Sequence, residues 1–226
     1  SALPDDRWLA ARMHYVDLPE YTAAIDKARE QYPELRVVKG MECEYIPEQQ
    51  TWYEDELLGD YKFDYLIGAA HFFLDADDEW VGTYGGTTSA KALVEFGNYT
   101  VKMMESGVFD FIAHPDLFGN CYEKWDANCT ACTRDIMAAA AETGVGLEVN
   151  ALGIRKQNAK ASDNPFPLYP WLPFWEEASN YDVNVIVNAD AHRPEDLQGK
   201  TGEAFQIVAD LGLKHMDVDA IGARAR

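Results

Sequence analysis

Five apolar runs in this chain each end at a polar or acidic side chain, and this pattern limits the possible fold more than any other feature. The runs are short and rich in Val, Ile, Leu and Phe, as expected of strands that are buried on both faces. Their ends carry Glu42, His71, His114, Glu148 with Asn150, and Asp190 with His192. Since the carboxyl ends of parallel strands gather at one rim, where barrel enzymes place their functional groups, the pattern predicts a metal-dependent barrel enzyme.

Segments with helical periodicity lie between these runs. The expected helices cover residues 17–32, a buried stripe of Leu93, Phe96, Thr100 and Met103 that ends at Gly107, residues 128–144 and residues 202–212. Pro33 should end the first helix, and a Gly closes each of the others. Strands are expected to follow the first two helices, at Val37 and Val38 and at Phe109. This alternation predicts an α/β fold with a parallel sheet, and its closure into a barrel is an inference from the spacing.

Two long connections, residues 74–89 and 157–174, interrupt the alternation. The first is rich in Asp and Gly, and the second carries several Pro, which excludes regular helix. Long connections in compact domains often serve as functional lids, so both are predicted to be irregular loops over the opening of the active site. Glycines 82, 85 and 86 are not followed by the Lys-Ser/Thr of a phosphate-binding loop, so we interpret them as turn residues.

The composition limits the number of domains, the location and the partners that are expected. A chain of 226 residues with 47% hydrophobic content can bury one sizeable core, so a single domain, residues 1–226, is expected. Neither a long apolar stretch nor a signal peptide is apparent, which predicts a cytoplasmic protein with no membrane partner. The net charge of -20 opposes nucleic acid as a partner, because Lys and Arg supply most of that affinity. Cys129 and Cys132 are interpreted as structural helix residues. No oligomeric state follows from these features.

The strand ends carry short motifs in a fixed order. They are Gly40-Met-Glu42-Cys-Glu44-Tyr45-Ile-Pro47, Gly68-Ala-Ala-His71, His114-Pro-Asp116, Glu148-Val-Asn150-Ala-Leu-Gly153-Ile-Arg155 and Asp190-Ala-His192. Over residues 18–213 this series resembles the polymerase and histidinol phosphatase (PHP) superfamily, and within it the histidinol-phosphatase type. The resemblance implies a distorted TIM-like (β/α)7 barrel. The family's opening His-x-His motif, with the Asp and His that follow it, has no match here, so the first strand–helix unit is missing. We expect sequence upstream of Ser1, and a naturally shortened homologue is the alternative.

Metal ligands can be proposed from the residue types. Neutral imidazole and carboxylate together bind zinc, manganese or iron, so Glu42, His71 and His114 are candidate ligands of one divalent ion. The resemblance implies up to three ions in the family. In that scheme Glu42 and Asp190 share a second ion, and His192 serves a third. Because part of the family's ligand set is absent, fewer ions are expected here.

The resemblance implies a phosphomonoesterase that hydrolyses a small substrate, L-histidinol phosphate, to L-histidinol and phosphate in histidine biosynthesis. Activated water would attack phosphorus, and Asp190 or His192 would protonate the leaving alkoxide. Arg155 ranks first among the candidate phosphate-binding residues, which also include Asn150, Arg193 and Lys156. The cationic amine of such a substrate would be complemented by Glu44, Asp116 or Glu148, although Glu148 equally well orients a metal ligand.

Two other functions stay open. One is a metal-dependent amidohydrolase-type hydrolase, another barrel class with His and Asp at its strand ends. The other is a catalytically impaired PHP-like binding or scaffold domain, which the absence of the first motif favours. Analysis of bound metal separates these alternatives.

Overall fold

A six-stranded sheet forms the centre of the structure, a computed structural model that describes residues 13–221. In sheet order the strands are β1 (Gly40–Glu44), β2 (Tyr65–Ala69), β5 (Phe111–Ile112), β6 (Gly146–Asn150), β7 (Asn184–Asn188) and β8 (Lys214–His215). Every neighbouring pair in this sheet is parallel. The predicted α/β fold with a parallel sheet is therefore confirmed, while residues 1–12 and 222–226 of the expected domain lie outside the described residues.

Both faces of the sheet are apolar. Leu66 of β2 packs into the main core between the sheet and its helices, whereas its neighbours Tyr65 and Ile67 join a second cluster with Phe111 and Ile186. This division follows from the alternation of side chains along a strand. Within residues 13–221 the sheet ends at β1 on one side and at β8 on the other. Closure into a seven-stranded barrel therefore stays a prediction.

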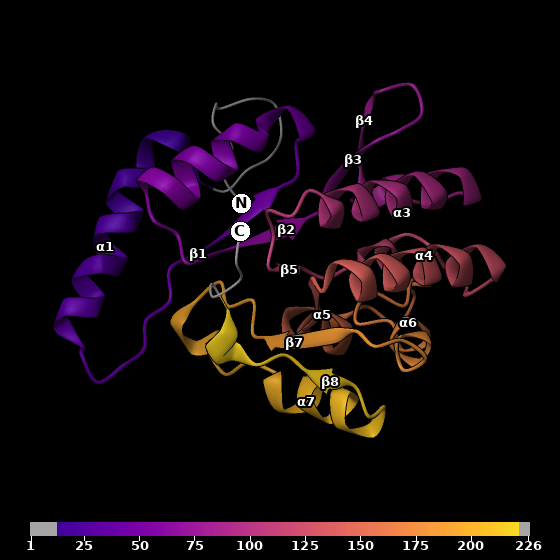
Figure 1. The fold of residues 1–226 in the computed structure, drawn as a ribbon. Helices are drawn as coiled ribbons and strands as arrows, with labels where there is room; N and C mark the ends of the chain where they lie inside the picture. Colours follow the sequence, from indigo (N-terminus) through magenta and orange to yellow (C-terminus); the bar gives the residue numbers. More distant parts are fainter. Residues whose placement is uncertain (1–12, 222–226) are drawn as a thin grey trace.

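Helices cover the sheet. The longer ones are α1 (Leu18–Gln31), the π-helix η3 (Trp52–Asp60), α3 (Ala90–Glu105), α4 (Ala127–Thr143), α5 (Ala151–Ala159), α6 (Leu172–Ala178) and α7 (Thr201–Asp210). The 3-10 turns are η1 (Tyr15–Asp17), η2 (Pro47–Gln49), η4 (Leu117–Asn120), η5 (Pro194–Asp196) and η6 (Val218–Ala220). Figure 1 shows α3 and α4 side by side, α1 near β1, and α7 near β8.

The four helices expected from the sequence are present, because their end signals act locally. The Asp126 carboxylate caps α4 by accepting hydrogen bonds from the Asn128 and Cys129 backbone N–H groups, and Gly144 ends it in the left-handed region at φ 68°. Cys129 and Cys132 are both buried in this helix. Burial raises the pKa of the Cys129 thiol to about 12, as suits a packing residue rather than a redox centre.

Three local predictions were wrong. The segment 74–89 is not wholly irregular, because β3 (Phe72–Leu74) and β4 (Trp80–Gly82) form an antiparallel hairpin that leads into α2 (Thr83–Gly86). The Asp75 carboxylate builds the hairpin turn by accepting from the backbone N–H groups of residues 77 and 79, both at 2.9 Å. Likewise α6 begins inside the Pro-rich connection, because its Pro lies in the first turn, where no N–H is needed. Finally, β1 begins at Gly40, after the two valines.

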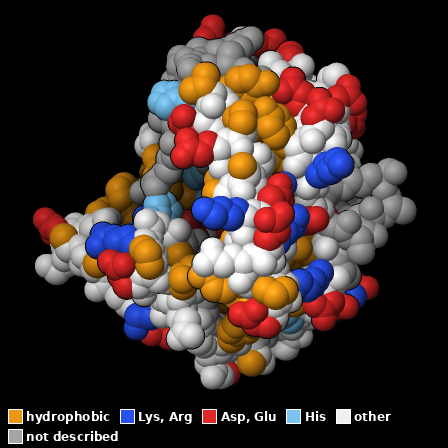
Figure 2. All heavy atoms as spheres, turned by 90° about the vertical axis from the view of Figure 1, so that its left-hand side faces the viewer, with side chains coloured by type: hydrophobic (Ala, Val, Ile, Leu, Met, Phe, Trp, Pro, Cys, Tyr) orange, Lys and Arg blue, Asp and Glu red, His pale blue; other side chains and the backbone are white. Residues whose placement is uncertain are grey.

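Figure 2 shows acidic, basic and apolar side chains interleaved on one face of the molecule. Among the described residues, several charged side chains form ion pairs at the surface, such as Arg36 with Asp219 and Arg134 with Glu177. Exposed pairs of this kind add little to stability. Among the described helices, none combines the length and the apolar character needed to cross a bilayer.

Candidate metal centre

A cavity of about 680 Å³ opens at the carboxyl ends of the strands. Its lining consists of Glu42, His71, Phe72, Gly82, Tyr84, His114, Leu152, Lys156, Tyr169, Asp190, Ala191 and His192. This volume lies within the range of about 300–1,000 Å³ that is usual for small-molecule sites. The structure thus brings together five of the side chains that the sequence pattern had singled out, from segments as far apart as β1 and the loop after β7.

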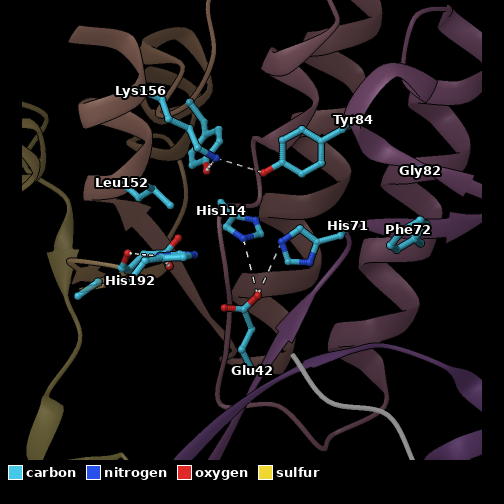
Figure 3. A pocket seen from close by; sticks show the side chains of 12 residues that line it. Glu42, His71, Phe72, Gly82, Tyr84, His114, Leu152, Lys156 and His192 are labelled. Atoms are coloured by element: carbon cyan, nitrogen blue, oxygen red, sulfur yellow. Dashed lines mark hydrogen bonds and ion pairs between the residues drawn. The ribbon is translucent and has the colours of Figure 1, made fainter. Parts of the chain in front are cut away.

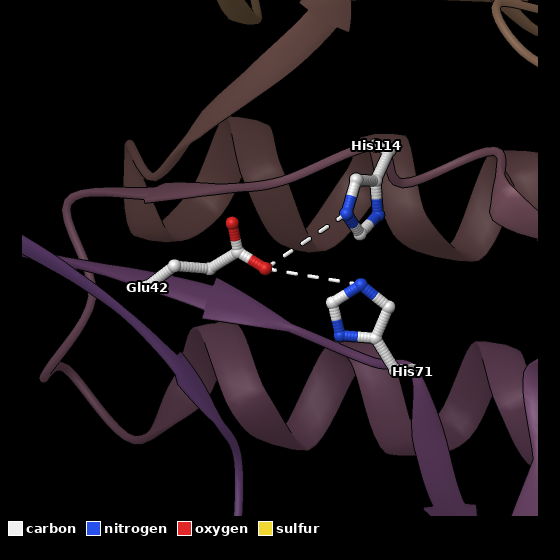
Figure 4. A group of neighbouring side chains, drawn as sticks. All are labelled: Glu42, His71 and His114. Atoms are coloured by element: carbon white, nitrogen blue, oxygen red, sulfur yellow. Dashed lines mark ion pairs between the residues drawn. The ribbon is translucent and has the colours of Figure 1, made fainter. Parts of the chain in front are cut away.

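Three potential ligands meet at one wall of this cavity. Glu42 lies in β1, His71 follows β2 and His114 follows β5, and these strands are neighbours in the sheet. Glu42 Oε1 is 3.8 Å from His71 Nε2 and 4.0 Å from His114 Nε2. Figure 4 shows the carboxylate facing both imidazoles, whose ring centroids are 4.8 Å apart. The three side chains each offer a ligand atom within 4.8 Å of the others.

Glu44 supports the first of these imidazoles. Its Oε1 is hydrogen-bonded to His71 Nδ1, and its Oε2 accepts from the His71 backbone N–H at 3.2 Å. Burial lowers the pKa of His71, but the hydrogen bond to Glu44 and the charges of Glu44 and Glu42 outweigh it and raise the pKa above its usual value. With Nδ1 directed to Glu44, Nε2 is the nitrogen that faces Glu42. A carboxylate behind a histidine in this way is typical of metal ligands.

His114 is buried, and Glu148 fixes its backbone. The His114 N–H donates to Glu148 Oε2 at 2.9 Å, and the residue adopts φ 32°, in the left-handed region. Such conformations persist where surrounding contacts enforce them, often at active sites. Burial, with the nearby charges of His71 and Lys156, holds the pKa of His114 well below its usual value. A lowered pKa favours the neutral ring, which is the form that binds metals.

A divalent cation fits these three residues. Two donors at about 2.0–2.2 Å from one zinc ion lie at most about 4.4 Å apart, so both separations from Glu42 suit a shared ion. Nδ1 of the buried His114 ring has no hydrogen-bond partner among the described residues, and Nε2 is too far from Glu42 for a hydrogen bond. Burial also raises the pKa of Glu42; the charge of His71 opposes this, whereas those of Asp190 and Glu44 add to it. A cation would relieve this repulsion between carboxylates.

Asp190 and His192 lie on the same cavity, in the loop after β7. His192 Nδ1 is 2.9 Å from the Asp190 carbonyl oxygen and 3.4 Å from its Oδ1. Asp190 has φ 46°, so its backbone lies in the left-handed region, as that of His114 does. The Asn150 amide connects this loop to the buried carboxylate of Glu148 by donating to Asp190 Oδ2 at 3.1 Å and to Glu148 Oε2 at 2.8 Å.

Three of the four candidate phosphate-binding residues lie outside the cavity lining, whereas the fourth, Lys156, is part of it. Arg155 does not line the cavity; its guanidinium donates to the carbonyl oxygens of Ala189 and Asp190 at 2.9 and 3.1 Å. Asn150 is 1% exposed and caps α5 by accepting from the Gly153 N–H at 3.0 Å. The third of these residues, Arg193, is exposed and lies outside the cavity lining. A phosphate role for these three stays a prediction.

The carboxylates that were candidates for a cationic substrate group are not in the cavity lining. Asp116 is buried, and its Oδ2 accepts from the Trp171 N–H at 2.6 Å and from Trp175 Nε1 at 3.0 Å. It thereby fastens the start of α6 to the strand end that carries His114. Burial raises the pKa of Glu148 to about 7, although Asn150 and Asn188 donate hydrogen bonds to it. This position favours the orienting role that was considered for Glu148.

Sequence reasoning missed two contributors to the site, Tyr84 and Tyr169, and gave Glu44 a role with the substrate rather than with His71. The supporting role of Glu44 could have been found, because residues two apart in a strand share a face, and Glu42 already pointed to that face. Tyr84 and Tyr169 come from the two long connections, which do contribute to the cavity as expected. No local signal distinguishes these two from the other aromatic residues of those segments, since tertiary packing alone brings them to the His71 and His114 rings.

Comparisons with known proteins support the fold. No protein-family model matches the sequence, and no curated protein matches it significantly. The structure is similar to the crystal structure of histidinol phosphate phosphatase from Lactococcus lactis, solved with zinc, L-histidinol and phosphate, with a TM-score of 0.62. The match covers 88% of this chain and 76% of that one, at 15% sequence identity. At this identity the likeness concerns the fold alone.

Proposed function

We propose that this chain is a metal-dependent phosphomonoesterase whose divalent ion is held by Glu42, His71 and His114. The observation that carries the proposal is the meeting of one carboxylate and two imidazoles, from three strand ends, at one wall of the cavity. When bound, such an ion offsets the charge of phosphoryl oxygens and lowers the pKa of water. Zinc is the first ion to test, because the similar Lactococcus enzyme was solved with it, and manganese and iron are the alternatives.

We assign proton transfer to Asp190 and His192. Both side chains line the cavity that contains the three ligands, and the contacts of His192 Nδ1 with Asp190 leave Nε2 as the nitrogen for exchange with a substrate. A proton donated from this pair would stabilise the leaving alkoxide. The same two residues are the proposed ligands of any further ion, and Arg155, Asn150 and Arg193 remain candidates for contact with the phosphate group.

The proposed substrate is L-histidinol phosphate, hydrolysed to L-histidinol and phosphate. Support comes from the similar fold of an enzyme solved with L-histidinol and phosphate, and from a cavity with room for such a molecule. Three aromatic side chains, Phe72, Tyr84 and Tyr169, line the cavity, and such rings pack well against a planar imidazole.

The test combines metal analysis with phosphate release. Purified protein is assayed for bound Zn, Mn and Fe and for hydrolysis of L-histidinol phosphate and of p-nitrophenyl phosphate. We expect the His114→Ala variant to lose most of its metal affinity, by more than about 100-fold, which exceeds the effect usual for supporting residues. His215→Ala, at an exposed position on β8, is the matched control and should keep both metal and activity.

Each outcome has a distinct meaning. Metal-free and inactive wild-type protein contradicts the proposal and favours the scaffold alternative. If only p-nitrophenyl phosphate is hydrolysed, the proposed phosphatase activity stands and L-histidinol phosphate is rejected as its substrate. Full metal content in His114→Ala removes this residue from the ligand set.

A further inference from the structure

Two consecutive basic residues of α5 point in different directions. Lys156 lines the cavity, whereas Arg155 turns away from it to the carbonyl oxygens of Ala189 and Asp190. An α-helix has about 3.6 residues per turn, so side chains of neighbouring residues point about 100° apart. When one of them faces the cavity, the other therefore points away from it. The cation that α5 presents to the contents of the cavity is therefore Lys156.

Two tyrosines hold the Lys156 ammonium. Nζ donates to the Tyr169 hydroxyl at 2.8 Å and lies 3.5 Å from the Tyr84 hydroxyl. It also lies 5.0 Å from the ring centroid of Tyr169 and 5.5 Å from that of Tyr84. A phenol is uncharged near neutral pH, so these contacts orient the ammonium without neutralising it.

The same tyrosines contact the candidate metal ligands. The Tyr169 ring centroid is 5.6 Å from that of His114, and the Tyr84 ring stacks on His71 at 6.2 Å with an interplanar angle of 10°. Figure 3 shows Lys156 and Tyr84 on the opposite side of the two imidazoles from Glu42. A ligand in the cavity would thus have the three-residue cluster on one side and the ammonium on another.

We propose that Lys156 binds the anionic oxygens of the phosphate group in this cavity, and that Tyr84 and Tyr169 position its ammonium for this contact. The inference rests on the proposed phosphomonoesterase function and deepens it. A lysine ammonium binds phosphate oxygens as a compact point charge, and Lys156 lines the same cavity as the three candidate metal ligands. Because the Arg155 guanidinium is engaged by backbone carbonyl oxygens, Lys156 is better placed than Arg155 for contact with the phosphate group.

The test uses inorganic phosphate as the probe and does not depend on turnover. Binding is measured by isothermal titration calorimetry with zinc-loaded protein, and zinc per chain is measured on the same samples. The variants are Lys156→Gln, Lys156→Arg and Lys160→Gln. Lys160 is the matched control, because it is exposed at the end of the same helix and its replacement removes the same charge.

We expect Lys156→Gln to weaken phosphate binding by about 10-fold or more, as is usual for loss of a charged hydrogen bond, with its zinc content unchanged. Lys156→Arg keeps the charge and should recover most of the affinity, and Lys160→Gln should match the wild type. Equal phosphate binding by zinc-loaded Lys156→Gln and wild type overturns the inference but leaves the proposed function standing. Loss of zinc from Lys156→Gln also overturns it, since the residue then acts on the metal site. A wild type that binds no zinc refutes the proposed function itself.

Discussion

Replacing Glu44 with Gln tests how the candidate metal centre holds one of its ligands. Glu44 is 3% exposed, and its carboxylate accepts from two donors of the same residue, His71 Nδ1 and the His71 backbone N–H. A Gln side chain has one acceptor oxygen where Glu has two. One of the two His71 donors therefore loses its partner, and the negative charge behind the imidazole disappears.

The expected loss of zinc affinity is about 10–100-fold, the range for residues that support a metal ligand. This corresponds to about 1.4–2.8 kcal/mol, at about 1.4 kcal/mol per tenfold change. A hydrogen bond to a charged group contributes about 1.5–3 kcal/mol, so the single bond lost from His71 accounts for an effect of this size.

The assay is competition for zinc between the protein and a chromophoric chelator at constant pH. Glu48→Gln serves as the control, because it removes the same charge from an exposed position four residues further along the chain. If Glu44→Gln binds zinc within about twofold of the wild type, then Glu44 does not set the orientation of His71, and the reasoning about this ligand is refuted.

Three further predictions concern stability. Arg155→Met removes the two hydrogen bonds to the loop after β7 and should lower the free energy of unfolding in urea by about 2 kcal/mol or more, whereas Arg193→Met, at an exposed position, should change it by under about 0.5 kcal/mol; equal effects would contradict the structure. In Gly153→Ala the new Cβ would lie 2.2 Å from the Tyr169 carbonyl oxygen, so we expect a loss of about 1–3 kcal/mol, while Gly202→Ala meets nothing within 4 Å and should be neutral or stabilising. Zinc at about 100 times its Kd should stabilise the folded protein by about 2.7 kcal/mol relative to protein kept metal-free by a chelator. This corresponds to a rise of roughly 5–10 °C in Tm, measured by differential scanning calorimetry. An unchanged Tm would mean that the folded state does not bind the ion preferentially.

The helix ends and the alternation of helices with parallel strands were predictable, because their signals are local. Asp126 and Gly144 bound α4 through contacts with backbone groups a few residues away. The apolar runs needed only their own composition to indicate buried parallel strands. By contrast, the hairpin of β3 and β4 was missed, because its turn depends on one Asp side chain in a segment whose Asp and Gly content resembles an irregular loop.

The position of the candidate site was also predictable, because residues at the ends of neighbouring parallel strands must lie near one rim. This placed Glu42, His71 and His114 together from the sequence pattern. Barrel closure was not settled in the same way, since it depends on which strands pair at the two edges of the sheet. Within the described part of the chain these edges are β1 and β8.

The sequence by itself determined the alternation of strands and helices and the chemical types at the rim, because both are set by short-range patterns of burial and by capping. The tertiary structure alone decided which of two adjacent cations, Arg155 or Lys156, reaches the cavity. It also decided that Glu44 contacts the His71 ring and that Glu148 contacts the His114 backbone N–H. These choices depend on the rotation of α5 against the sheet and on contacts between segments distant in sequence. Such contacts form only when the whole core packs.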